Sequence, residues 1–224
     1  MFWREEDDDA PFVVPDDIVD LQFAISCRAL PVDHAAPLAA AIRQQLPWFA
    51  DEPAAGLHLI YGADSGNGWE RPEQGDELLY LSRRTPLVLR LPRHRLDDAM
   101  ALTGSELQIA GQTLQIGRAK PRLLSDHPAQ YARFVVSDEG DDEDRFIARV
   151  VTELQQLQLQ FKKVLCGRRV SFQFPDATIN ARSVMVADLP KPDAVKLQQH
   201  GIGSHRQSGF GLFQPHKTVT RVAG

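Results

Sequence analysis

The pattern of hydrophobic and polar positions predicts a recognisable order of elements in the first half of the chain. Strand patterns cover residues 18–30, 56–62, 77–92 and 106–117, and the third of these is expected to break near Pro86. Apolar residues at helical spacing cover residues 34–46 and 93–104. The resulting order, β-α-β-β-α-β, is that of a ferredoxin-like domain.

The same order recurs in the second half. Strand patterns cover residues 131–137, 164–174, 178–189 and 209–215. Helical patterns cover residues 143–159 and 190–201, and the first of these has an acidic first turn that favours a helix. We therefore expect an α+β fold of two tandem ferredoxin-like (RRM-like) domains, at residues 16–120 and 121–224, after an acidic N-terminal arm at residues 1–15.

Local signals add three predictions about where elements begin and end. Asp33 is placed to cap the first helix, because Asp is a favoured N-cap residue. Gly111 indicates a hairpin turn or a break between two strands. Gly201 follows the last helix and predicts a Schellman ending, in which Ile202 packs back on Leu197.

Charge is unevenly distributed along the chain. The formal net charge is −5, but residues 5–9 hold five acidic side chains and residues 138–144 hold six. Blocks of like charge are usually solvated or disordered. The remaining residues carry 25 basic and 19 acidic side chains, so we expect the folded body to present a basic face.

Cysteine usage and hydropathy bear on the compartment. Cys27 and Cys166 lie far apart in apolar surroundings, which indicates buried free thiols in a reducing cytosol. The opening MFWREEDDD lacks the apolar region of a signal peptide, and no apolar run approaches the roughly 20 residues that cross a bilayer. We expect a cytoplasmic protein without a membrane partner.

The segment GIGSHRQSGFG, at residues 201–211, concentrates glycine and basic side chains. Glycine permits close approach of a ligand to the backbone, and successive exposed amides can bind an anion. The segment lacks the GxxxxGK[ST] pattern of a phosphate-binding P-loop, and it lacks the strand-then-helix setting of a dinucleotide site. Two interpretations remain: a phosphate-binding loop, or a loop and turn without a ligand.

The stretch LQQHGIGSHRQSGFGLFQP resembles the C-terminal glycine-rich signature of the sixth CRISPR-associated (Cas) protein family, the endoribonucleases that cut CRISPR repeat RNA. ALPVDHAAPLAAAI resembles the entry to the first helix, where many members keep a histidine. The resemblance implies two tandem ferredoxin-like domains, in agreement with the order of elements above. It also implies metal-independent cleavage of precursor RNA to guide RNAs, with 2′,3′-cyclic phosphate and 5′-hydroxyl products. Relatives that share the fold and the loop without cutting keep a non-cleaving role open.

Cleavage of this kind needs a general base, and the resemblance points to His34. Histidine suits that role because its ordinary pKa is near 6.5. The positive end of the predicted helix favours the neutral form that a base requires. His34 also shares the apolar stripe of the helix with Leu38 and Ile42, so a packing or capping role is the alternative. His58 is the second candidate for the base.

Contacts with RNA phosphates are expected from glycine backbone and from basic side chains. The residues we assign to RNA binding are Gly203, His205, Arg206, Gly209, Gly211, Lys217, Arg93, Arg95, Lys162, Lys163, Arg168 and Arg169. Arg93 and Arg95 lie at a helix start, where cations oppose the helix dipole, and this placement hints at a functional demand. A solvated surface is the alternative for all these cations.

The sequence thus supports three hypotheses of function. The leading one is a metal-independent endoribonuclease specific for CRISPR repeat RNA, in stem-loop or single-stranded form, with no cofactor and no metal site. The second is a non-cleaving RNA-binding subunit that joins other subunits of a CRISPR effector complex. The third is a ferredoxin-like interaction protein without an RNA function.

Overall fold

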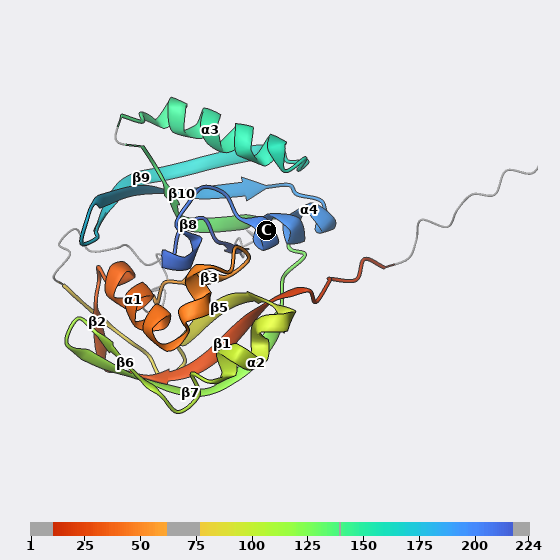
Figure 1. The fold of residues 1–224 in the computed structure, drawn as a ribbon. Coiled ribbons are helices and arrows are strands. Elements are labelled where there is room, and N and C mark those ends of the chain that lie inside the picture. The colour runs from red at the N-terminus through yellow and green to blue at the C-terminus, as the bar shows by residue number, and fades with distance from the viewer. Residues whose placement is uncertain (1–10, 62–76, 139, 217–224) are drawn as a thin grey trace, which may run out of the picture.

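The computed structural model describes residues 11–61, 77–138 and 140–216. Most of the predicted acidic arm and Lys217 therefore lie outside the described residues. Within these ranges no helix is long and apolar enough to span a membrane. The chain folds into two layers of sheet with helices between and above them (Figure 1).

The N-terminal half forms a five-stranded antiparallel sheet in the order β3-β5-β1-β7-β6. Its strands are β1 (Ile18–Ser26), β3 (Gly56–His58), β5 (Pro86–Pro92), β6 (Glu106–Ile109) and β7 (Gln112–Leu123). The connections contain α1 (Ala35–Gln45), η1 (Pro47–Ala50), η2 (Arg93–Arg95) and α2 (Leu96–Met100). The order of the four strands β3-β5-β1-β7 is that of a ferredoxin-like domain, as predicted. The hairpin around Gly111, which has a φ of 81°, is confirmed.

Two predicted strands each divide in two. The regions 18–30 and 77–92 contribute β1 and β5 to the main sheet, and also β2 (Ala29–Pro31) and β4 (Leu78–Tyr80). β2 and β4 pair only with each other within the described ranges, as a separate two-stranded sheet. The division at Pro86 follows from the missing amide proton of proline, which confines proline to the start or edge of a strand.

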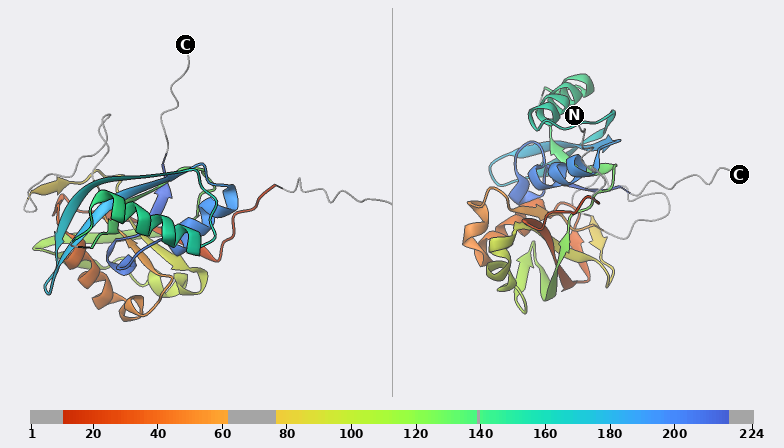
Figure 2. Two further views of the ribbon diagram at one scale, coloured as in Figure 1. Left: turned by 90° about the horizontal axis from the view of Figure 1, so that it is seen from above. Right: turned by 90° about the vertical axis from the view of Figure 1, so that its right-hand side faces the viewer.

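The C-terminal half forms a four-stranded sheet in the order β11-β8-β10-β9. Its strands are β8 (Gln130–Val136), β9 (Lys163–Gln173), β10 (Thr178–Ala187) and β11 (Phe213–Pro215), and its helices are α3 (Glu143–Gln156), η3 (Arg206–Ser208) and α4 (Lys191–His200). This is again the ferredoxin-like strand order, so the fold is two tandem ferredoxin-like domains. The views in Figure 2 show α3 on the outer side of this sheet, away from the N-terminal domain. The predicted domain boundary between residues 120 and 121 remains a prediction, and β7 extends beyond it to Leu123.

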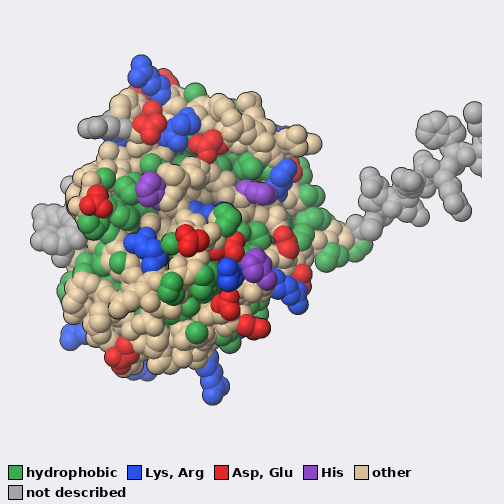
Figure 3. All heavy atoms as spheres, in the orientation of Figure 1, with side chains coloured by type: hydrophobic (Ala, Val, Ile, Leu, Met, Phe, Trp, Pro, Cys, Tyr) green, Lys and Arg blue, Asp and Glu red, His purple; other side chains and the backbone are tan. Residues whose placement is uncertain are grey.

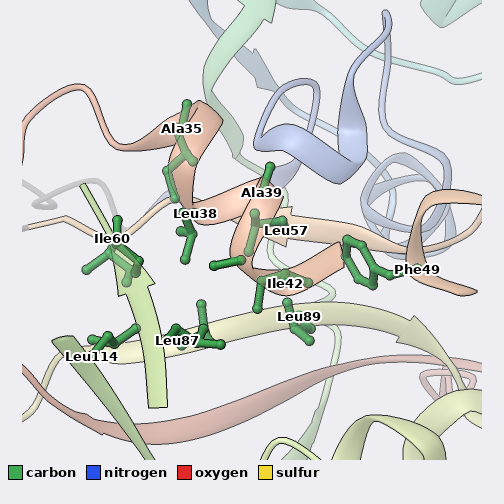
Figure 4. Close-up of a cluster of buried hydrophobic side chains, with 14 of the residues drawn as sticks. Ala35, Leu38, Ala39, Ile42, Phe49, Leu57, Ile60, Leu87, Leu89 and Leu114 are labelled. Carbon is green, nitrogen blue, oxygen red and sulfur yellow. The ribbon is translucent and has the colours of Figure 1, made fainter. Parts of the chain in front are cut away.

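The core of the N-terminal domain lies between α1 and the five-stranded sheet. Apolar residues at helical spacing place Leu38 and Ile42 on the same face of α1, where both are completely buried. Figure 4 shows them packed against Leu57, Leu87 and Leu89 of β3 and β5. This packing holds the start of α1, and therefore the segment that carries the predicted catalytic histidine, in a defined position.

The core continues across the domain boundary. Phe134, Phe172 and Phe210 of the C-terminal half belong to the same hydrophobic cluster as α1. Phe172 lies edge-on to both other rings, at centroid distances of 4.7 Å and 5.0 Å. Phe210 comes from the glycine-rich segment, so that segment packs into the interface between the domains.

Both predicted helix ends are corrected by the structure. The N-cap of α1 is His34 rather than Asp33, because the Asp33 carboxylate accepts a hydrogen bond (2.8 Å) from the backbone amide of Gln173 in the other domain. α4 ends in a simple left-handed turn in place of a Schellman motif: the Gly201 amide donates to the Leu197 carbonyl at 2.8 Å. The Ile202 amide donates instead to Gly211.

Candidate functional site

The glycine-rich segment folds back on itself instead of opening as a loop. Gly201 and Gly211 lie against each other, and a Cβ on either glycine would overlap backbone atoms of the opposite arm. The Ile202 amide donates to the Gly211 carbonyl (3.2 Å), and the Gly211 amide donates to the Phe134 carbonyl of β8 (2.7 Å). Gly201 and Gly211 also have φ values of 64° and 71°, in the left-handed region that favours glycine. Close packing of the chain therefore explains both glycines.

Gly209 is explained by a contact between the domains. It is buried, with a φ of 103°, and a Cβ there would overlap the side chain of Leu59 just after β3. Gly209 and Gly211 are both buried, and their missing side chains make room for protein atoms; their assignment to RNA contacts remains a prediction.

The exposed tip of the segment is Gly203, Ser204 and His205. The backbone at Gly203 and His205 is left-handed, with φ values of 70° and 64°. The Gly203 amide, a predicted phosphate donor, already donates to a carboxylate oxygen of Glu153 on α3 at 2.6 Å. The Ser204 hydroxyl lies 2.8 Å from Nδ1 of His205. The groups open to a ligand at this tip are thus the side chains of Ser204 and His205.

Arg206 faces the protein interior. Its guanidinium donates to the carbonyls of His200 and of Gln199 (2.8 Å for Gln199), which are otherwise unpaired at the end of α4. Burial, together with the nearby Arg90 guanidinium and in opposition to the Asp20 carboxylate, lowers the pKa of Arg206 to about 10. In this structure Arg206 therefore caps the end of α4, and its predicted phosphate contact remains a prediction.

His34 lies at the start of α1 with 2% of its surface exposed. Its Nε2 accepts a hydrogen bond from the backbone amide of Ile60 at 3.1 Å. Because Nε2 accepts, the ring proton of the neutral form is on Nδ1, which lies 2.9 Å from the Pro31 carbonyl. The residue before Ile60 is Leu59, which contacts Gly209. The structure thus joins the two sequence regions that were predicted to act together.

A buried polar network connects the two domains beside this site. Arg90 of β5 is completely buried and forms a bidentate ion pair with Asp20 of β1, at 2.8 Å and 3.0 Å. It also donates to the carbonyls of Gln198 and Phe213 in the C-terminal domain, at 2.9 Å and 2.8 Å. Burial alone would raise the pKa of Asp20, but Arg90 and His58 outweigh that effect and hold the pKa well below its usual range.

His58, the second predicted candidate for the base, belongs to this network. Its Nδ1 lies 2.7 Å from the side-chain amide of Gln214 on β11, and its Nε2 lies 3.6 Å from the Asp20 carboxylate. Burial lowers the pKa of His58, with partial opposition from Asp20. His58 is 6% exposed and holds the domains together.

Comparison with known proteins places this architecture in a family. The Cas6 family model, described as Cas6 Crispr, matches residues 19–218. The chain belongs to the Cas6 family. A CRISPR-associated endonuclease Cas6 from Myxococcus xanthus (strain DK1622) is 28% identical over 204 residues, which cover 91% of this chain and 84% of the relative.

Solved structures agree at the level of the fold. A structure described as CRISPR associated protein Cas6 superposes with a TM-score of 0.61 at 12% identity, covering 89% of this chain and 100% of the other. A structure described as an RAMP protein binding different RNA substrates superposes with a TM-score of 0.62 at 13% identity, covering 89% and 100%. The tandem ferredoxin-like fold of this Cas6 protein is therefore shared with solved members of its family.

The cations around η2 have acidic partners. Arg93 pairs with Asp16, and Arg95 pairs with Glu52 (3.4 Å) and Asp98 (2.9 Å). Arg95 also lies over the ring of Trp48, 4.8 Å from its centroid. These contacts explain why cations occupy a helix start in this Cas6 protein, and the assignment of Arg93 and Arg95 to RNA binding remains a prediction.

The remaining basic candidates lie at or near β9, the edge strand of the C-terminal sheet, and all of them are exposed: Lys162, Lys163, Arg168 and Arg169. Arg169 donates to backbone carbonyls of Asp138 and Asp141 (3.3 Å and 2.6 Å), so it also holds the loop before α3. On the face that Figure 3 shows, basic and acidic side chains are interspersed and form no large patch of one sign. The RNA contacts of these residues remain predictions.

No role was assigned to Asp20 or Arg90 from the sequence. A charged residue inside the apolar run LVLRLP was the available signal, because such a residue is rarely buried unless it is paired. The two cysteines were expected to be buried thiols, but Cys27 and Cys166 are free and only partly buried. The Cys27 thiol donates to the Ala29 carbonyl at 3.1 Å.

Proposed function

We propose that this Cas6 protein is a metal-independent endoribonuclease that cleaves CRISPR repeat RNA into guide RNAs. Membership of the Cas6 family supports this proposal, as does the relative that is named a CRISPR-associated endonuclease. The structural observation that carries it is the connection from His34 through Ile60 and Leu59 to Gly209. This connection places a histidine of the first domain beside the glycine-rich segment of the second.

The proposed reaction is an internal transesterification of the RNA. The 2′-oxygen attacks the adjacent phosphorus, the bond from phosphorus to the 5′-oxygen breaks, and a 2′,3′-cyclic phosphate and a 5′-hydroxyl form. A base takes the proton of the 2′-hydroxyl, and the departing 5′-oxygen receives a proton. The neutral form of His34, with its proton on Nδ1 toward Pro31 and a lone pair on Nε2, has the protonation state that a base needs.

For His34 to act, the Ile60 amide has to leave Nε2. A single hydrogen bond of this kind contributes only about 0.5–1.5 kcal/mol net to stability. Binding of RNA across the domain interface can supply that energy, and the 2′-hydroxyl would then replace the amide as the donor to Nε2. We therefore propose that RNA binding opens the backbone next to Leu59.

A non-cleaving RNA-binding subunit is the second candidate function, and one observation favours it. His34 is 2% exposed and both of its ring nitrogens contact the backbone, which is the arrangement of a histidine that joins two segments. In this alternative the protein binds repeat RNA and serves other subunits of an effector complex.

Incubation with repeat RNA in the presence of EDTA separates these functions. Cleavage to a cyclic phosphate supports the endoribonuclease, and binding without cleavage supports the subunit. A histidine base also predicts that the single-turnover rate rises with pH and then reaches a plateau once the base is neutral.

Two histidine variants test the base. His34→Ala should lower the single-turnover rate roughly 10²- to 10⁴-fold while RNA affinity changes little. His200→Ala, an exposed histidine at the end of α4, is the matched control and should keep cleavage within a few-fold of the original protein. Because His34 also satisfies backbone groups, the melting temperature is measured alongside. Full activity of His34→Ala, or a loss that disappears on cooling to a temperature where the variant is folded, contradicts the assignment.

A further inference from the structure

The two-stranded sheet of β2 and β4 is separate from both ferredoxin-like sheets. Its inner side is anchored in the core by the Leu30–Leu79 pair, with exposures of 0% and 5%. Its outer side carries Leu78 and Tyr80, which are 46% and 67% exposed. Figure 1 shows β2 beside α1 at the edge of the N-terminal domain. The ribbon therefore presents an open tyrosine on a rigid support.

A tight turn follows β4 and displays two arginines. The Thr85 amide donates to the Ser82 carbonyl, and the Arg84 amide donates to the Ser82 hydroxyl, at 3.1 Å and 3.2 Å. The two hydroxyls of Ser82 and Thr85 also lie 3.1 Å apart. This arrangement fixes Arg83 and Arg84 at the centre of the turn, where both are exposed.

A third arginine belongs to the same end of the ribbon. Arg28 directly precedes β2, and its carbonyl accepts a hydrogen bond from the Leu81 amide at 3.2 Å. Within the described ranges, none of Arg28, Arg83 and Arg84 pairs with a carboxylate. Like charges at one end of a ribbon repel one another when no counter-ion is near, and an anionic ligand relieves that repulsion.

We propose that this ribbon is a binding site for a single-stranded segment of RNA. The three guanidinium groups contact successive phosphates, and the Tyr80 ring stacks on a base, a combination typical of single-strand binding surfaces. Three unpaired cations favour a polyanion over an apolar protein partner, whose contacts would be limited to Leu78 and Tyr80.

The ribbon lies directly before the proposed base in the chain. The carbonyl of Pro31, the last residue of β2, is the group that faces Nδ1 of His34. An RNA strand held on the ribbon therefore runs toward the start of α1, so the site would take the RNA next to the cleavage position. This inference rests on the proposed function.

Binding of a labelled, non-cleavable single-stranded repeat RNA, with a 2′-deoxy substitution at the cleavage position, tests the site. The double variant Arg83→Ala/Arg84→Ala should raise Kd at least tenfold, and the slope of log K against log salt should become shallower by about 1.4, as expected for two lost contacts to a single strand. Tyr80→Ala should raise Kd roughly 5- to 150-fold without changing the slope, because stacking releases no counter-ions. Tyr80→Phe keeps the ring and should bind as the original protein does.

The matched control is Arg43→Ala/Arg145→Ala, which removes two exposed arginines on α1 and α3 with the same change of net charge. This control should change Kd less than twofold. An equal effect of both double variants would overturn the inference, since general charge would then explain it. Unchanged binding by the ribbon variants would also overturn it while leaving the proposed function intact, and would direct the search to a protein partner. If the original protein binds no repeat RNA at all, both proposals fail together.

Discussion

Gly209→Ala offers the clearest test of what the glycine-rich segment does. The structure assigns Gly209 to packing: its φ is 103°, and a Cβ would overlap the side chain of Leu59, with Cδ2 at 2.5 Å. A glycine retained for ligand binding would behave differently on substitution, because its Cβ would meet solvent. Gly203 is the internal comparison, since its Cβ would meet only a Val135 methyl at 3.5 Å, an ordinary contact.

The expected change in the free energy of unfolding of Gly209→Ala is the sum of two unfavourable contributions and one favourable one. A left-handed backbone costs an L-residue about 1–2 kcal/mol, and overpacking costs about 1–3 kcal/mol. Replacing glycine by alanine returns about 0.4–1 kcal/mol by restricting the unfolded chain. The net loss for Gly209→Ala is about 1.5–4 kcal/mol, which lowers Tm by roughly 3–16 °C for a chain of this length. Gly203→Ala bears the backbone cost and receives the same gain, a net loss of about 0.6–1 kcal/mol, and should lower Tm by about 4 °C or less.

The assays are thermal unfolding and RNA binding well below Tm, and a double-mutant cycle isolates the clash. Leu59→Ala removes the side chain that the new Cβ meets, so Leu59→Ala/Gly209→Ala should be more stable than the sum of the single losses predicts, by about 1–3 kcal/mol. RNA affinity of folded Gly209→Ala should stay within about threefold of the original. A variant that keeps its Tm but loses RNA binding would refute the packing argument and restore Gly209 to the RNA interface.

Three further predictions concern the buried network and the exposed tip. Arg90→Leu leaves the Asp20 carboxylate, whose side chain is only 18% exposed, and the carbonyls of Gln198 and Phe213 without their partner, and should cost about 3–5 kcal/mol, seen as a Tm lowered by roughly 6–20 °C; a shift below 2 °C would contradict the pairing. Because burial lowers the pKa of His58 below its ordinary value, its contribution to stability is complete above about pH 6.5 and declines as pH falls. His58→Gln should therefore flatten the loss of urea-unfolding free energy between pH 7 and 5, and an unchanged slope would show that His58 is not its source. Glu153→Gln removes the carboxylate charge on the Gly203 amide, so RNA should bind about two- to fivefold more tightly at low salt; weaker binding would mean that the carboxylate only supports the tip.

The fold was largely predictable because the apolar residues follow the alternation of strands and the spacing of helices clearly. The stripe of Leu38 and Ile42 needs nothing but helical geometry to define a buried face. Prediction failed where pairing depends on a distant segment. The break near Pro86 was predictable, but the sequence did not show that residues 78–80 leave the main sheet and pair with residues 29–31 as the β2–β4 ribbon.

The site was predictable in place but not in detail. Glycines and histidines signalled the glycine-rich segment and the start of α1, and the structure brings these regions together. The purpose of each glycine could not be predicted, because it depends on the atom that fills the vacant space. For Gly209 that atom belongs to Leu59, in the other domain. A glycine in the sequence indicates a left-handed or crowded backbone, but it does not show whether a phosphate or a leucine occupies the space beside it.

The partners of the basic side chains could not be predicted from the sequence either. Sequence counts charges but does not pair them, so Arg90, Arg93 and Arg28 look alike until their neighbours are known. Arg90 forms an ion pair with Asp20, and Arg93 forms one with Asp16. Arg28 has no carboxylate partner within the described ranges. The basic side chains available to RNA are therefore those that do not already pair with an acidic side chain. By that criterion an RNA surface on a chain of net charge −5 is sought where cations lack acids, and in this Cas6 protein the β2–β4 ribbon meets it.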